Sequence, residues 1–163
     1  MKKINDAISV FFSTSIIGLA LGGTVIWKIF QGVMKKNKQE TKKLTDYYFI
    51  LNHWIALKQK KKSIVAFFER NNYKTVAIYG MRELGERLIG ELDQTSVVVT
   101  CIIDQNIVDI ENNIPVLHPD DIIPEVDVIV VTASYYFNEI EAKLKEKTNG
   151  IIIPIDDVIY SKY

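Results

Sequence analysis

A glycine-containing segment at residues 76–85 carries the clearest chemical signal in the sequence. The segment is typical of a strand that passes through a turn into a helix. Gly80 would permit the tight turn, and Gly85 would permit close packing of the helix on the strand. The free amides at the start of such a helix can hold a phosphate group. The candidate phosphate-binding residues are Gly80, Met81, Arg82, Glu83, Leu84 and Gly85.

Arg82 occupies the position of the second glycine in the dinucleotide-binding pattern G-x-G-x-x-G. That glycine normally lets a pyrophosphate approach the backbone closely. A side chain at this position either blocks the usual pose or replaces it with a contact between a guanidinium and a phosphate.

Further candidate residues follow two other predicted strands. Asp104 ends the second strand, where dinucleotide sites place a carboxylate that binds a ribose hydroxyl. Thr132, Ser134 and Tyr135 follow the third strong strand, at the carboxyl edge where open sheets bind ligands. We expect Ser134 to cap a helix rather than to bind a phosphate, and Tyr135 or Tyr136 to stack on a base or to cover the edge.

The elements that must position these residues repeat a strand–helix–strand pattern from Tyr73 onward. Apolar runs that are hydrophobic on both faces belong to parallel sheets covered by helices. The predicted strands are 75–79, 97–103, 127–132 and 151–155, and the predicted helices between them are 83–92 and 135–147. The pattern predicts a small open α/β sheet of Rossmann type, with a fifth strand if 115–117 adds one.

The N-terminal part of the sequence predicts a membrane anchor. Residues 7–27 contain no charged side chain, and 21 helical residues span roughly 30 Å, the thickness of a bilayer core. A cleaved signal peptide is the competing interpretation, although the apolar stretch is longer than usual for one. Lysines are concentrated after the stretch, which places the C-terminal domain in the cytoplasm. Gly18 and Gly22 have the spacing that lets two spanning helices approach, which suggests a homodimer.

Residues 35–72 form a basic connector between the anchor at 1–34 and the Rossmann-like domain at 73–163. The connector contains no Pro or Gly, and its apolar side chains recur at helical spacing. These apolar positions are Leu44, Tyr47, Tyr48, Leu51, Trp54, Ile55 and Leu57. Such a stripe could lie on anionic headgroups, pack on the domain or pack on a second copy.

Charge is divided unevenly along the chain although the formal net charge is zero. Residues 1–62 hold twelve Lys against three acidic residues, a net charge of +9, and residues 63–163 hold eight Lys and Arg against seventeen acidic residues, a net charge of −9. This asymmetry suggests that the first part meets an anionic surface. An acidic domain is a poor partner for nucleic acid.

Several stretches of the domain resemble small Rossmann-like proteins of bacterial surface-polysaccharide synthesis. They are also similar to the nucleotide-sugar-binding N-terminal domain of sugar O- and N-acetyltransferases. The stretches that carry the resemblance are 54–58, 78–85, 101–104, 114–116, 126–132 and 156–160, within a region of roughly 54–160. The resemblance implies a Rossmann-like fold, with NAD(P) or a nucleotide-sugar as ligand and a polysaccharide-assembly protein as partner. Members commonly have glycine where Arg82 stands, and the sequence has no hexapeptide repeats for acyl transfer.

No set of catalytic residues can be recognised in the sequence. The Tyr-x-x-x-Lys pair of short-chain dehydrogenases is absent after the third strand, and His118 is typical of a surface turn. The single cysteine, Cys101, falls in a strand and is expected to be buried. The sequence therefore favours a binding module. Two alternatives remain open: a subunit of an NAD(P)-dependent oxidoreductase or epimerase-like enzyme, and a structural adaptor with a vestigial pocket.

Overall fold

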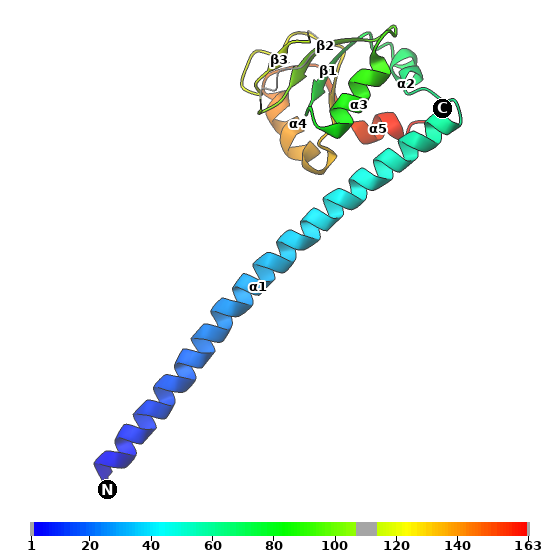
Figure 1. Cartoon of the computed structure of the whole chain (residues 1–163). Helices are drawn as coiled ribbons and strands as arrows, with labels where there is room; N and C mark the ends of the chain where they lie inside the picture. Colours follow the sequence, from blue (N-terminus) through cyan, green and yellow to red (C-terminus); the bar gives the residue numbers. More distant parts are fainter. Residues whose placement is uncertain (1, 107–113, 163) are drawn as a thin grey trace. The chain divides into compact units, whose positions relative to one another are not determined.

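A computed structural model describes residues 2–106 and 114–162, and for residues 2–25 it describes the backbone without the side chains. The chain begins with one long helix, α1 (Lys2–Gln59) (Figure 1). Contacts between residues divide the chain into two compact units, residues 1–45 and residues 46–163. Helix α1 therefore contributes its last turns to the second unit, which contains every strand that the structure describes.

Five parallel strands form one sheet in the order β3-β2-β1-β4-β5. The strands are β1 (Thr75–Tyr79), β2 (Val98–Ile103), β3 (Val116–Leu117), β4 (Val128–Val131) and β5 (Ile151–Pro154). This strand order is that of the Rossmann fold. The predicted α/β class is confirmed, and so is the fifth strand near Pro115.

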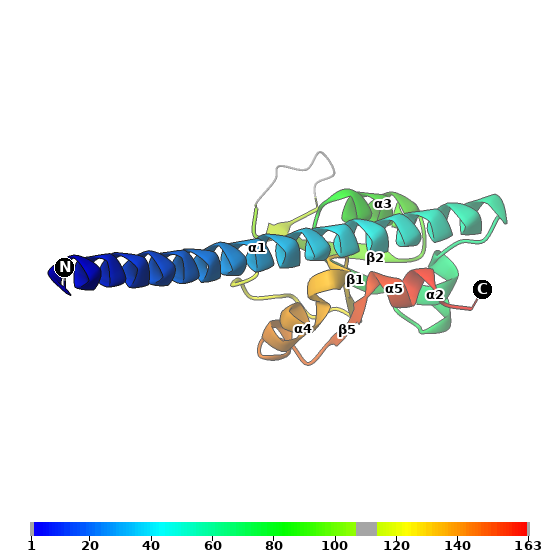
Figure 2. The ribbon, with the colours of Figure 1, turned by 90° about the horizontal axis from the view of Figure 1, so that it is seen from below.

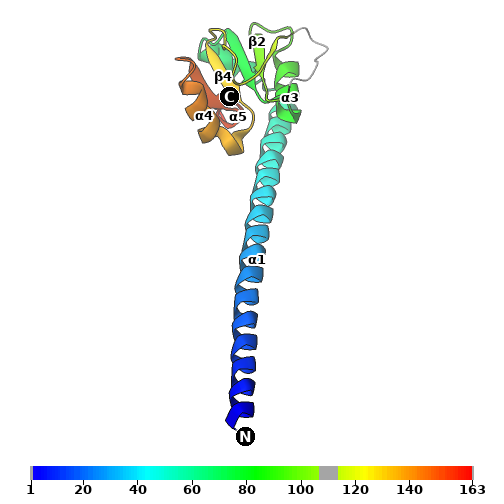
Figure 3. The ribbon, with the colours of Figure 1, turned by 90° about the vertical axis from the view of Figure 1, so that its left-hand side faces the viewer.

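Helices cover both faces of the sheet (Figure 3). They are α2 (Val65–Arg70), α3 (Glu83–Leu92), α4 (Phe137–Lys145) and α5 (Ile155–Ile159), with a short 3-10 turn, η1 (Ser134–Tyr136), before α4. Side chains of α1, α2, α3 and α5 share one core with one face of the sheet. On the opposite face, Cys101 and its neighbours in the sheet pack against Ile140 and Leu144 of α4. The predicted burial of Cys101 is thus confirmed.

The apolar stripe of the connector packs largely on the domain. Trp54 and Leu57 are buried in the same core as the sheet, and Tyr47 and Leu51 pack against it. Three further residues of the stripe are exposed, namely Leu44, Tyr48 and Ile55. Periodicity identified the helix but not its partner, because an apolar face looks the same whether lipid or protein covers it. The compact unit consequently begins at residue 46, within the predicted connector.

The predicted membrane span at 7–27 falls mainly on residues 2–25, whose side chains lie outside the described part of the chain. Within the part of the chain that the structure describes, no helix is both long enough and apolar enough to cross a bilayer.

Candidate functional site at the carboxyl edge of the sheet

All five strands are parallel, so their carboxyl ends meet at one edge of the sheet. The sequence-predicted residues follow three of these ends: Gly80 to Gly85 follow β1, Asp104 follows β2, and Thr132 to Tyr135 follow β4. The strand order reverses between β1 and β4, which are neighbours in the sheet. Such a reversal is where open α/β sheets bind ligands.

Gly80 and Gly85 have the backbone roles that the sequence predicted. Gly80 has a φ of +95°, and a Cβ on it would lie 2.6 Å from Oγ1 of Thr132. A Cβ on Gly85 would lie 2.2 Å from the carbonyl oxygen of Gly80. The turn after β1 therefore requires glycine for its conformation at one position and for close packing at the other.

Asp104 reaches across from β2 to the glycine turn. Its Oδ2 accepts a hydrogen bond from the backbone N–H of Met81 at 2.8 Å, and its Oδ1 accepts one from the N–H of Asn106 at 2.9 Å. The Met81 amide is thus already paired with an anion. Each carboxylate oxygen has two lone pairs, so each can still accept a hydrogen bond from a ligand hydroxyl.

Helix α3 begins at this turn without a side-chain cap. Arg82 is its N-cap residue and makes no side-chain capping bond, while Glu83 and Glu86 lie in the first turn. The positive end of the helix dipole and the first-turn amides favour an anion here, and the two glutamates oppose it. Arg82 is exposed. The Arg82 side chain is therefore not buried inside the turn.

On the β4 side, Thr132 is 2 % exposed and its hydroxyl lies 2.9 Å from the Gly80 carbonyl oxygen and 3.1 Å from that of Tyr79. The expected capping role of Ser134 is wrong: its Oγ is buried and has no hydrogen-bond partner within the described part of the chain. Ser134 is the first residue of the 3-10 turn and not the residue before it, and its hydroxyl is buried. The rings of Tyr135 and Tyr136 pack edge to face, with their centroids 5.1 Å apart.

Tyr79 is a candidate residue that the sequence did not single out. Burial is the main cause that raises the pKa of its phenol, and the negative charges of Asp104 and Asp120 add to the effect. The phenol therefore stays protonated and can donate a hydrogen bond at neutral pH. The signal was present in the sequence, because Tyr79 immediately precedes the glycine turn.

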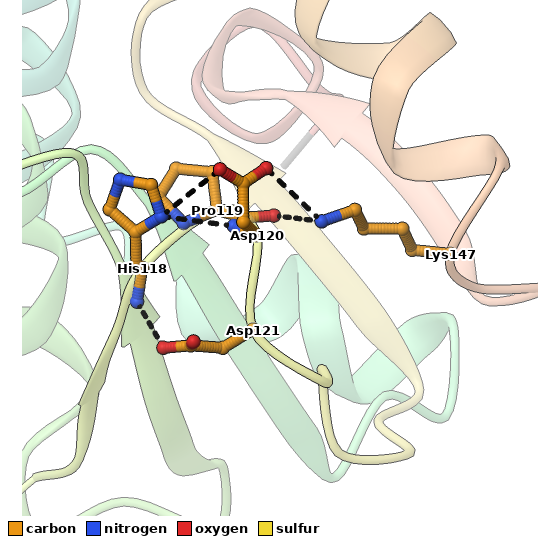
Figure 4. A network of polar contacts seen from close by, with 5 residues as sticks. All are labelled: His118, Pro119, Asp120, Asp121 and Lys147. Carbon is orange, nitrogen blue, oxygen red and sulfur yellow. Dashed lines mark hydrogen bonds and ion pairs between the residues drawn. The ribbon is translucent and has the colours of Figure 1, made fainter.

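His118 follows β3 at the same edge and belongs to a turn held by polar contacts (Figure 4). Its backbone N–H donates to Oδ2 of Asp121 at 2.7 Å, and its Nδ1 accepts the N–H of Asp120 at 3.2 Å. Lys147, beyond α4, donates to the carbonyl oxygen of Pro119 at 2.6 Å. These contacts hold His118 in a turn, as the sequence indicated.

A cavity of about 450 Å³ lies at the other end of α3, away from this edge. Its lining includes Gly90, Asp93 and Val98, from the end of α3 and the start of β2. The cavity contains none of the candidate residues of the glycine turn.

The strand order and the glycine turn define a Rossmann-like α/β domain. Residues 71–152 match the family described as C2185-like, N-terminal, and the chain belongs to this family. The match includes the glycine turn but not the part of α1 that completes the core. No curated protein and no solved structure matches the chain.

Proposed function

We propose that this chain is a membrane-tethered module that binds a nucleotide or a nucleotide-sugar at the carboxyl edge of its sheet. One observation carries the proposal: the glycine turn after β1 adjoins Ala133 after β4, with a Cβ on Gly80 placed 3.9 Å from the Ala133 nitrogen. This is the point where the strand order reverses, and α3 starts there without a side-chain cap.

The residues suggest how such a ligand is held. The first-turn amides of α3 receive a phosphate, and the exposed Arg82 adds a positive charge. Asp104 is oriented by its two backbone donors, so its remaining lone pairs accept ribose hydroxyls. A carboxylate at this position disfavours a ribose that carries a 2′-phosphate, so NAD or a nucleotide-sugar fits better than NADP.

The tether rests on the predicted span and on the exposed residues that follow it. In residues 26–45, the part of the first unit whose side chains the structure describes, the apolar side chains lie within one arc of the helix, and lysines occupy much of the remainder. The exposed apolar residues of this part are Ile26, Trp27, Ile29, Phe30, Val33, Met34 and Leu44. An apolar face beside basic residues fits an anionic lipid surface, with the domain in the cytoplasm. The role in surface-polysaccharide synthesis, with an assembly protein or a second copy as partner, rests on the family resemblance of the sequence.

Ligand binding to the full chain in detergent micelles tests the proposal. We expect UDP-sugars or NAD(H) to raise the melting temperature and to bind in calorimetry, and we expect Asp104→Asn to weaken this binding at least about tenfold. Asp93→Asn is the matched control, because Asp93 is exposed and follows the far end of α3. If NAD(H), NADP(H), UDP-sugars and coenzyme A all leave the protein unchanged at millimolar concentration, the binding proposal is wrong. Flotation of the full chain with vesicles tests the tether separately.

A further inference from the structure

The last turns of α1 pack against α3 and α5 on one side of the sheet (Figure 2). The α1 side chains that are buried in this core are Ile50, Trp54 and Leu57. Another face of the same turns is left open within the described part of the chain, where Tyr48 is 62 % exposed and Ile55 is 57 % exposed. These two residues are seven positions apart, so they lie on one face of the helix.

The exposed apolar residues of α1 follow a heptad pattern. From residue 27 to residue 55, nine positions are alternately three and four residues apart, and we call these positions the seam. Six of them hold apolar side chains that are each more than half exposed, namely Trp27, Phe30, Met34, Leu44, Tyr48 and Ile55. A regular alternation of this kind over four heptads is typical of a helix that packs lengthwise on another helix.

The other three seam residues are Asn37, Thr41 and Leu51, so the seam contains no charged side chain. Residues 27–55 contain eight Lys, Glu and Asp residues, and all eight fall outside the seam. Five of the six lysines in this range occupy heptad positions b and c, which point away from a partner helix. A face that stayed in water would tolerate charge, so the exclusion of charge indicates that the seam is covered.

A second copy of α1 fits this seam, because a heptad face is complementary to itself. Aromatic side chains bury roughly 150–250 Å² each, so the exposed parts of the seam in two copies offer on the order of 1,000 Å², enough for a specific interface. The lysines at b and c remain in solvent when two seams meet. Ile26, Ile29 and Val33 lie beside the seam and stay available to lipid.

We propose that α1 pairs with α1 of a second copy of this chain through the seam, as a parallel two-stranded coiled coil that presents two nucleotide sites together. The parallel direction and the pairing of sites rest on the proposed function, because a shared membrane would place both N-termini on the same side. The seam lies outside the family match at 71–152. The core uses heptad positions c and g of α1, at Ile50, Trp54 and Leu57, so the domain and the second copy contact different residues.

Disulfide cross-linking of the full chain in detergent micelles tests the pairing. In a parallel dimer each seam position faces its own counterpart, so Thr41→Cys should form a covalent dimer under mild oxidation. Gln39→Cys is the matched control, because residue 39 is exposed on the same helix but lies outside the seam. Cys101 is buried and stays in both variants. We expect at least about tenfold faster cross-linking of Thr41→Cys.

A second pair of variants tests the seam without cysteine. Tyr48 and Phe49 are neighbouring aromatic residues that are 62 % and 54 % exposed, and only Tyr48 belongs to the seam. Tyr48→Glu brings two negative charges together in the dimer and should weaken dimerisation at least about tenfold, whereas Phe49→Glu should leave it almost unchanged. Sedimentation equilibrium of the full chain in micelles measures both, and circular dichroism checks that both variants fold.

A wild type that stays monomeric at micromolar concentration would overturn the inference, and lipid or another protein would then cover the seam. Equal cross-linking at residues 39 and 41, or equal effects of the two glutamates, would overturn it as well. A dimer that Tyr48→Glu weakens but Thr41→Cys does not cross-link would refute the parallel direction. A chain that pairs as expected and binds none of the nucleotides would instead refute the proposed function, and one that pairs without floating with vesicles would refute the tether.

Discussion

The Cα of Gly85 packs directly on the carbonyl group of Gly80, so a Cβ at position 85 would lie 2.2 Å from the carbonyl oxygen. The obstacle is backbone, which cannot move aside as a flexible side chain would. Gly85→Ala should therefore push α3 away from the turn and lower the free energy of unfolding by about 1–3 kcal/mol or more. Urea unfolding monitored by circular dichroism would measure the loss.

Gly90 provides the matched control in the same helix. A Cβ on Gly90 meets nothing within 4 Å, so Gly90→Ala should stabilise the protein by roughly 0.5–1 kcal/mol through the better helix propensity of alanine. If the two variants had similar stabilities, the close contact of α3 with the turn would be wrong.

The place where the domain begins leads to a second prediction. A fragment of residues 46–163 should fold, because it keeps the side chains of Ile50, Trp54 and Leu57 in the core. A fragment of residues 63–163 loses all three, and truncation of one such side chain already costs about 2–5 kcal/mol. Since domains are stable by only about 5–15 kcal/mol, the shorter fragment should not unfold cooperatively. Thermal melts of both fragments decide this, and a cooperative melt of the shorter one would contradict the prediction.

This boundary shows where sequence reasoning reached its limit. The predicted strand 75–79 and helix 83–92 agree with β1 and α3 at both ends, because an apolar run and an apolar helical face are local patterns. The partner of an apolar face is not a local property. The sequence therefore identified Trp54 as part of the apolar stripe of the connector. Its position in the domain core depends on contacts with residues far along the chain.

The candidate site likewise has some features that the sequence predicted and others that it could not predict. The conformation of Gly80 followed from the pattern of its segment, since a tight turn there needs a positive φ. The bond from Met81 to Asp104 joins the turn after β1 to the residue that follows β2, and no spacing in the sequence specifies which donor a carboxylate will meet. The packing of Tyr47 against the core could not be predicted either, because it depends on how α1 packs on the domain.

Asp127 gives a prediction about pH. Its Oδ2 accepts hydrogen bonds from the backbone N–H groups of Thr75 and Lys74 and from the Thr75 hydroxyl, and these bonds lower the pKa of the Asp127 carboxyl below 3.8. A lowered pKa in the folded state stabilises the protein above the unfolded pKa, and this stabilisation is lost as the pH falls through the folded value.

The wild type should therefore be more stable than Asp127→Ala at pH 6, and the difference should shrink as the pH falls below about 4. Urea midpoints measured from pH 6 to pH 2.5 would show the trend. Asp93→Ala, at an exposed position after α3, is the comparison. A difference for Asp127→Ala that stays constant over this range would rule out the carboxylate as its cause.

Cys101 should be inert in the folded protein. The residue is 1 % exposed, and burial raises the pKa of its thiol to about 11. At pH 8 only about one thiol in a thousand is then ionised, and the thiolate is the reactive form. Iodoacetamide should label the native chain very slowly and the chain in urea quickly, as mass spectrometry would show. Rapid labelling without denaturant would mean that β2 opens readily.

The hydrogen bonds of Asp104 lead to a prediction that needs no ligand. Both carboxylate oxygens accept a backbone N–H, one from Met81 and the other from Asn106. Asparagine has one acceptor oxygen, so in Asp104→Asn the amide nitrogen must face an N–H group as donor against donor. The variant should lose roughly 1–3 kcal/mol of unfolding free energy in the absence of nucleotide.

Asp104→Glu separates charge from geometry at this position. The longer side chain keeps two acceptor oxygens but displaces them from β2, so it should recover part of the stability lost in Asp104→Asn while still disturbing the turn. Urea unfolding of both variants at pH 7, with amide chemical shifts of Met81 and Asn106, would follow the two bonds. If Asp104→Asn were as stable as the wild type, the carboxylate would not be what holds the glycine turn to β2. Ligand binding would then have to orient Asp104 itself.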